Sequence, residues 1–126
     1  MRKFALLAAL LAVFVAGCGT SRVTNLTTTR HPRNATGMYP VEFQWDSTQQ
    51  TQIPGTVKPY VVVGYDFYPM RPSLGISNRW ETVVPLGPDK TSLIYHFKIE
   101  YEYRTFGKPQ KSSKLSPSYK LEITEK

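Results

Sequence analysis

Between residues 93 and 104, large apolar side chains alternate with polar ones, and this alternation constrains the fold more than any other feature. One face carries Leu93, Tyr95, Phe97, Ile99, Tyr101 and Tyr103, the other carries His96, Lys98, Glu100, Glu102 and Arg104, and Ile94 departs from the pattern. A repeat of two residues is the period of a β-strand with one buried face, whereas an α-helix repeats every 3.6 residues. The segment therefore predicts a long, half-buried strand.

Shorter segments with the same period lie on both sides of this strand, separated by turn-forming residues. They are residues 41–45, 80–84 and 119–123. Residues 60–63 are instead an apolar, β-branched run that fits a central strand, and residues 66–68 resume it after Gly64. No segment after residue 17 has a convincing helical period. Six or seven short strands over about 90 residues are typical of a β-sandwich. We therefore expect a single all-β domain over residues 38–126, an antiparallel sandwich of about seven strands.

The N-terminus has the composition of an export signal. Arg2 and Lys3 precede a run of 13 consecutive apolar residues, 4–16. This run is too short for a transmembrane helix, which needs about 20 apolar residues. A basic start, a short apolar stretch and then small residues are typical of a signal peptide. We expect a signal helix over residues 1–17, whose removal would leave 109 of the 126 residues and 14 of the 16 basic residues.

The chain has a single cysteine, Cys18, so no internal disulfide can form. Cys18 directly follows Val15, Ala16 and Gly17, and this stretch resembles the lipobox of bacterial lipoproteins. The resemblance implies a diacylglycerol on the Cys18 thiol, cleavage before Cys18 and anchoring in a membrane of the bacterial envelope. In enteric lipoproteins an aspartate directly after the lipidated cysteine retains the protein at the inner membrane. Here that position is Gly19, which favours the outer membrane. The alternatives are a buried structural cysteine and a chance cysteine behind a plain secretory signal.

Residues 18–37 are rich in threonine and other small polar residues. This composition predicts a tether that starts at the lipidated cysteine, within which residues 23–28 could form a short first strand. A flexible segment of this length spans about 24 Å. That is enough to hold a domain just clear of the lipid head groups.

The second half of the chain carries a further resemblance. Trp80 opens a strand, Gly87-Pro88-Asp89-Lys90 forms a turn, Tyr95-His96-Phe97 begins the long strand, and residues 119–123 close the domain. This order is similar to early-set immunoglobulin-like domains and, among them, to glycogen-binding modules of carbohydrate-binding family 48. The resemblance implies an immunoglobulin-like β-sandwich. The family's Asp-Gly turn after the Tyr-x-Phe strand, which carries a sugar-contacting Trp or Lys, is absent here.

The sequence lacks the residue sets that catalysis and metal binding require. After residue 17 it holds two histidines, His31 in the expected tether and His96 on the polar face of the long strand. Glu100 and Glu102 share that face, where they are expected to form cross-strand ion pairs rather than a catalytic pair. Asp46, Asp66 and Asp89 are expected to stand singly in loops. We expect no enzyme activity, no bound metal and no cofactor.

Two groups of residues are candidates for binding. The first consists of aromatic residues beside loops, which suit interfaces; it contains Tyr65, Tyr68 and Phe106. The second is a basic loop over residues 104–114, with no acidic residue; it contains Arg104, Lys108, Lys111 and Lys114. Such a loop could meet anionic lipid, cell-wall polymer or an acidic partner, and the alternative is a solvated hairpin loop.

The aromatic residues of the strands leave two interpretations open. Trp45, Trp80 and the tyrosines of the long strand could form a platform on which sugars stack, but their position on the apolar faces favours core packing. We therefore expect a lipid-anchored envelope protein, a non-catalytic binding or structural module that contacts an unidentified envelope protein or polysaccharide. The alternative is a glucan-binding module of the cell surface. An exported lipoprotein is not expected to bind nucleic acid.

Overall fold

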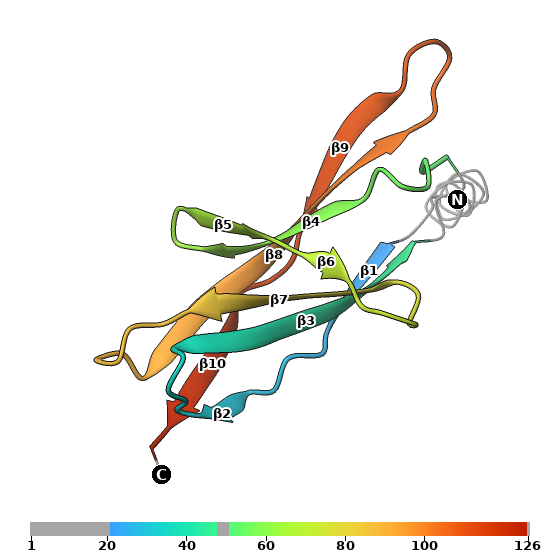
Figure 1. Ribbon diagram of the computed structural model, residues 1–126. Helices are drawn as coiled ribbons and strands as arrows, with labels where there is room; N and C mark the ends of the chain where they lie inside the picture. Colours follow the sequence, from blue (N-terminus) through green and yellow to red (C-terminus); the bar gives the residue numbers. More distant parts are fainter. Residues whose placement is uncertain (1–20, 48–50, 126) are drawn as a thin grey trace, which may run out of the picture.

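The computed structural model describes residues 21–47 and 51–125, which form two β-sheets packed as a sandwich (Figure 1). The strands are β1 (Ser21–Asn25), β2 (Arg30–Pro32), β3 (Met38–Ser47), β4 (Lys58–Val63), β5 (Asp66–Pro69), β6 (Arg71–Pro72), β7 (Arg79–Pro85), β8 (Ser92–Tyr103), β9 (Gln110–Leu115) and β10 (Tyr119–Thr124). None of these residues lies in a helix that could cross a membrane. The expected signal helix and Cys18 lie outside the described residues.

The prediction of an all-β sandwich is confirmed, but its details differ. One sheet has the order β1-β3-β7-β6, and the other has the order β2-β10-β8-β4-β5, with β9 also paired to β8. Ten strands are present in the described residues rather than about seven. The sandwich is also not wholly antiparallel, because β2 pairs with β10 in parallel. The additional strands are short or polar, so they lack the apolar alternation that predicts a strand.

The long strand β8 organises the larger sheet. Its predicted inward residues are buried from Leu93 to Ile99, and Ile94, which breaks the alternation, is exposed. One edge of β8 pairs with β4, while the other edge pairs with β10 and then with β9. Ser116 joins these two neighbours, because its N–H donates to the Phe97 carbonyl and its Oγ accepts from the Phe97 N–H at 2.8 Å. The edge of β8 is thereby hydrogen-bonded along its length.

The predicted basic loop over residues 104–114 is wrong in part. Residues 110–115 form β9, which pairs with residues 98–103 of β8. The side chains of β9 are exposed or half-buried on both faces, so the sequence Gln-Lys-Ser-Ser-Lys-Leu shows no apolar period. Backbone pairing with β8, rather than burial, makes this segment a strand. The loop itself is confined to residues 104–109.

The predicted tether also contains more structure than one possible strand. Residues Ser21–Asn25 form β1 at the edge of the smaller sheet, and Arg30–Pro32 form β2 at the edge of the larger one. The chain therefore crosses between the sheets within the Thr-rich segment. Thr27 fixes this crossing, because its Oγ1 donates to the Glu42 carbonyl and accepts from the Glu42 N–H, both at 3.0 Å. The small polar residues of this segment therefore belong to edge strands and do not form a flexible linker.

We expect Thr27→Val to lower the free energy of unfolding by about 1–3 kcal/mol, because valine keeps the shape but leaves both backbone groups of Glu42 without this partner. Urea denaturation followed by circular dichroism measures the change. The exposed neighbour Thr28, changed to valine, is the matched control and should shift stability little. Equal losses in both variants would contradict the role given to the Thr27 hydroxyl.

Aromatic rings form the centre of the core. Phe43 of β3 and Phe97 of β8 stack across the two sheets with ring centroids 4.7 Å apart, and neither is exposed. Tyr95 packs edge-on against Phe97 at 5.6 Å, and its hydroxyl accepts a hydrogen bond from Asn25 at 2.9 Å. The polar end of a buried tyrosine is therefore satisfied by the edge strand β1.

The C-terminal end of the sandwich is held by an exposed ion pair. Arg33, which follows β2, lies 2.6 Å from the Glu125 carboxylate, which follows β10, and also donates to the Lys90 carbonyl. The hydrogen bond from Arg33 lowers the pKa of the Glu125 carboxyl below its ordinary value, and the same bond raises the pKa of Arg33. Any contribution of this pair to stability is present at neutral pH and is lost as the pH falls through the lowered pKa of Glu125.

Candidate functional site

A cavity of about 590 Å³ opens at the end of the sandwich where β3 finishes and β7 begins. Its walls include both tryptophans of the chain, Trp45 and Trp80, together with Gln52 and Ile76. Register explains why the tryptophans meet there. Trp80 pairs directly with Phe43, so it shares the inner face with Phe43 and with Trp45 two residues later. The volume falls in the range of small-molecule pockets.

Two polar atoms buried in the cavity wall have no hydrogen-bond partner among the described residues: the Nε1 of Trp45 and the Oε1 of Gln52. Trp45 is only 4% exposed, so its indole N–H is removed from bulk solvent. Buried polar groups are nearly always paired, and an unpaired one costs free energy. Trp45 and Gln52 therefore bring to the cavity wall one buried donor and one buried acceptor that no described residue satisfies.

The Trp45 ring is fixed by its neighbours. Tyr101 of β8 lies with its ring centroid 6.0 Å away, and the ammonium of Lys114 on β9 lies 5.9 Å from the Trp45 ring centroid. The Trp45 backbone N–H donates to the Asn78 carbonyl at 2.8 Å. Trp80 is only half-buried, so part of its ring remains accessible. The site thus combines a fixed hydrogen-bonding edge with an accessible aromatic surface.

We expect Trp45→Phe to change the free energy of unfolding by no more than about 1 kcal/mol. The smaller ring leaves a void, but the substitution also removes an unpaired buried N–H, which offsets that cost. Chemical denaturation of the variant measures the balance. A loss of about 3 kcal/mol or more would show that the indole N–H is satisfied within the fold and is not free for an occupant.

The structure does not bring the predicted binding residues together. Tyr65 is fully exposed in the β4–β5 turn, which lies at the opposite end of the sandwich from the β8–β9 hairpin (Figure 1). Tyr68 lies on β5, within the strand predicted over residues 66–68, and it is half-buried against the core. Arg104, Phe106 and Lys108 are exposed in the β8–β9 connection. The prediction therefore joins residues of two separate surfaces.

Lys111 and Lys114 lie on β9, and they differ from each other. Lys111 is exposed, whereas Lys114 is half-buried and its ammonium donates to the Ser21 carbonyl at 2.7 Å and to the Ser21 Oγ at 2.8 Å. Lys114 thus fastens β9 to the beginning of β1. Cys18, the predicted lipidation site, lies outside the described residues.

The residues considered for catalysis are spread over the sandwich. His96 is half-buried on β8, while His31 lies on β2 with its ring 5.2 Å from Tyr39. Glu100 pairs with Lys98 on its own strand at 3.6 Å, so the expected cross-strand ion pair is replaced by one along the strand. Over residues 21–47 and 51–125, no group of three or more His, Cys, Asp and Glu is placed to hold a metal ion.

Sequence reasoning missed this cavity. Trp45 and Trp80 are on the apolar faces of their strands, as expected, and the period-two pattern cannot distinguish a packed end of the sandwich from a hollow one. Gln52 follows a polar run and carries no signal of its own. The available hint is chemical: a tryptophan on a buried face brings an N–H that needs a partner.

Comparison with known proteins identifies no relative: no family model, curated protein or solved structure matches this chain. The established result is an all-β domain of two sheets, and any function must be argued from the site itself.

Proposed function

We propose that this protein is a lipid-anchored component of the bacterial envelope that binds another envelope component without catalysis. The observation that carries the proposal is the cavity lined by both tryptophans, with an unpaired Trp45 N–H and an unpaired Gln52 carbonyl oxygen. We further propose that the sandwich belongs to the early-set immunoglobulin-like class that the second half of the sequence resembles.

The chemistry of the cavity defines what it would accept. An occupant must accept a hydrogen bond from Trp45, donate one to Gln52 and offer apolar surface to Trp80. A peptide segment meets these requirements through its backbone groups and an apolar side chain, and extended segments commonly dock on exposed sheet edges such as those nearby. An extended segment of an envelope protein is therefore the proposed occupant.

Anchoring rests on the stretch Val15-Ala16-Gly17-Cys18. Two or three acyl chains on Cys18 would bury enough CH2 groups, at about 0.8 kcal/mol each, for stable attachment. Gly19 favours the outer membrane. Attachment keeps the module near its partner and raises the effective concentration of the two.

A glucan is the second candidate ligand, because a specific feature of the cavity favours it. A sugar hydroxyl both accepts and donates hydrogen bonds, which matches the one unpaired donor of Trp45 and the one unpaired acceptor of Gln52. The accessible part of the Trp80 ring offers a surface for the apolar face of a pyranose. The weak resemblance to family 48 glycogen-binding modules supports the same alternative.

Affinity capture of the tagged, membrane-anchored protein after mild crosslinking tests the proposal. Capture of one dominant envelope protein is expected from the wild type and should be lost in both Trp80→Ala and Cys18→Ala. Trp45→Phe should also reduce it, although its stability is expected to be unchanged. Tyr65→Ala, at the far end of the sandwich, is the matched control and should capture as the wild type does.

Retention on insoluble glucans separates the two ligands. The purified protein should pass through if the occupant is a peptide. Retention that is lost in Trp80→Ala would favour the glucan. Neither capture nor retention, or capture that is indifferent to Trp80, would refute the cavity as the binding site.

A further inference from the structure

The β8–β9 hairpin projects from the sandwich as an arm, at the end where the described chain begins (Figure 1). We define the arm as residues 101–115, which comprise the end of β8, the connection 104–109 and β9. Strand β4 pairs with β8 only as far as Glu100. Residues 51–53 brace the base of the arm through backbone hydrogen bonds. The Ile53 N–H donates to the Glu102 carbonyl, and the Arg104 N–H donates to the Thr51 carbonyl. The connection beyond is exposed throughout.

The arm is cationic and has an aromatic tip. It holds four basic residues and a single carboxylate, Glu102, which faces Lys111 across the strand pair. The ion pairs of the described residues do not involve Arg104, Lys108 or Lys111. Phe106 is fully exposed between Arg104 and Lys108. Aromatic residues flanked by Lys and Arg suit the interface of an anionic membrane.

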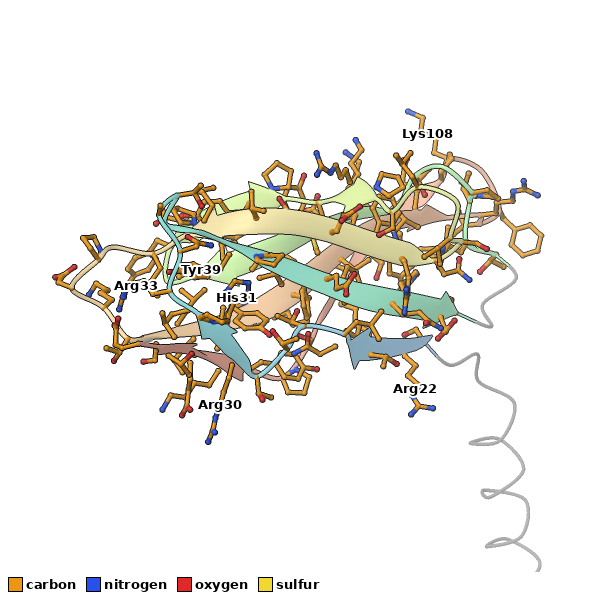
Figure 2. The ribbon with its side chains drawn as sticks, turned by 60° about the horizontal axis from the view of Figure 1, so that its bottom comes forward. Arg22, Arg30, His31, Arg33, Tyr39 and Lys108 are labelled. Carbon is orange, nitrogen blue, oxygen red and sulfur yellow. The ribbon has the colours of Figure 1, made fainter. Side chains whose placement is uncertain are left out.

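The start of the described chain lies at the base of this arm. Lys114 holds Ser21 through both the Ser21 carbonyl and the Ser21 hydroxyl. In Figure 2, the labelled side chains of Arg22 and Lys108 both extend from this end of the sandwich, whereas Arg33 and Tyr39 mark the other end. Arg22 is exposed, so it adds a further cation here.

Covalent geometry limits how far this end can stand from the lipid. Cys18 precedes Ser21 by three residues. Three Cα–Cα steps of 3.8 Å span at most about 11 Å, whatever conformation the chain takes. The flexible tether of about 24 Å expected from the sequence is therefore not available, because β1 begins so early. A lipid on Cys18 would place the base of the arm at the membrane surface.

We propose that the β8–β9 arm docks on the surface of the bilayer that holds the Cys18 lipid, with Phe106 in the interface and Arg104, Lys108 and Lys111 on anionic head groups. This inference rests on the proposed lipid anchor. It fixes which end of the sandwich faces the membrane and adds a second, electrostatic contact to the lipid. Reversal of the charge of the arm would therefore abolish its contact with an anionic membrane.

The lipidated full-length protein, reconstituted in vesicles, tests the inference. Phe106→Trp places a reporter at the tip, and Tyr65→Trp places an equally exposed reporter at the opposite end. In vesicles of phosphatidylcholine and phosphatidylglycerol with brominated acyl chains, Phe106→Trp should be quenched and Tyr65→Trp should not. In both variants, Trp45 and Trp80 contribute the same background fluorescence.

Charge is tested in the unlipidated Cys18→Ala protein produced without residues 1–17, whose apolar run would otherwise bind vesicles of either composition. Its partitioning to vesicles containing phosphatidylglycerol should exceed that to phosphatidylcholine vesicles by roughly tenfold or more, and added salt should abolish the difference. The triple variant Arg104→Glu, Lys108→Glu and Lys111→Glu should lose this preference. All three side chains are exposed, so the fold should be retained.

The outcomes separate the anchor from the arm. Flotation of the lipidated protein with equal quenching of both reporters would overturn docking of the arm and leave the anchor standing. Absence of any lipid on Cys18 would overturn the anchor and the inference with it. Binding to an acidic polymer without any preference for anionic vesicles would also overturn the inference.

Discussion

Phe97→Ala is expected to lower the free energy of unfolding by about 3–5 kcal/mol, enough to unfold much of a domain of this size. Phe97 is fully buried and stacks on Phe43 at 4.7 Å, so its removal opens a void between the two sheets. It also contacts Tyr95 and Tyr119, with ring centroids 5.6 Å and 5.8 Å away. The surrounding rings cannot all move to fill the space.

Urea denaturation or a thermal melt measures this loss. Ile94→Ala is the matched control, because Ile94 lies on the same strand but is 56% exposed on the opposite face. Its stability should change by about 0.5 kcal/mol or less. Similar losses in the two variants would contradict the packing of the two sheets through the Phe43–Phe97 stack.

Cys18→Ala, produced without residues 1–17, is expected to partition completely into the aqueous phase in a temperature-induced phase separation, whereas the wild type partitions into the detergent phase. Residues 1–17 are left out because the 13 apolar residues 4–16 would themselves enter the detergent phase. Loss of two or three acyl chains removes far more membrane affinity than the basic arm supplies.

Gly19→Asp provides the control for this experiment. It leaves Cys18 and the preceding residues intact, so the lipid should be attached and the protein should stay in the detergent phase. In an enteric host it should move from the outer to the inner membrane. A Cys18→Ala protein that remained in the detergent phase would contradict the lipid anchor.

Apolar periodicity predicted the parts of the fold that bury one face. Strands β3, β7, β8 and β10 follow their predicted segments, because Val41, Phe43 and Trp45 face the core and their polar neighbours do not. The β4–β5 hairpin follows as well, with Gly64 in its turn at a φ of 60°. That conformation suits glycine, which has no Cβ.

Strands without a buried face escaped prediction, wholly for β2 and β9 and in part for β1, for which only a short strand over residues 23–28 was expected. β1, β2 and β9 lie at edges and carry mostly polar, partly exposed side chains, so their order comes from hydrogen bonds to neighbours. Such pairing depends on residues far away in the chain, as between Ser21 and Ser47. No local pattern contains that information.

The candidate site escaped prediction for a related reason. The sequence shows that Trp45 and Trp80 face inward but not that the sheets leave a space of about 590 Å³ beside them. Gln52 comes from a connecting segment whose position is set by its bridge to Tyr103 on the arm. The cavity is thus a product of tertiary packing rather than of a motif.

Site-specific photocrosslinking in the membrane-anchored protein tests whether the cavity lined by Trp45 and Trp80 binds an envelope component. Ile76 lines the cavity and is 48% exposed, so a photoreactive residue there reports what enters the cavity. We expect position 76 to give a discrete adduct with one envelope component, and this adduct should be lost in Trp80→Ala. Position 65 should give none. No adduct from position 76, or the same adducts from both positions, would contradict a binding site at this end of the sandwich.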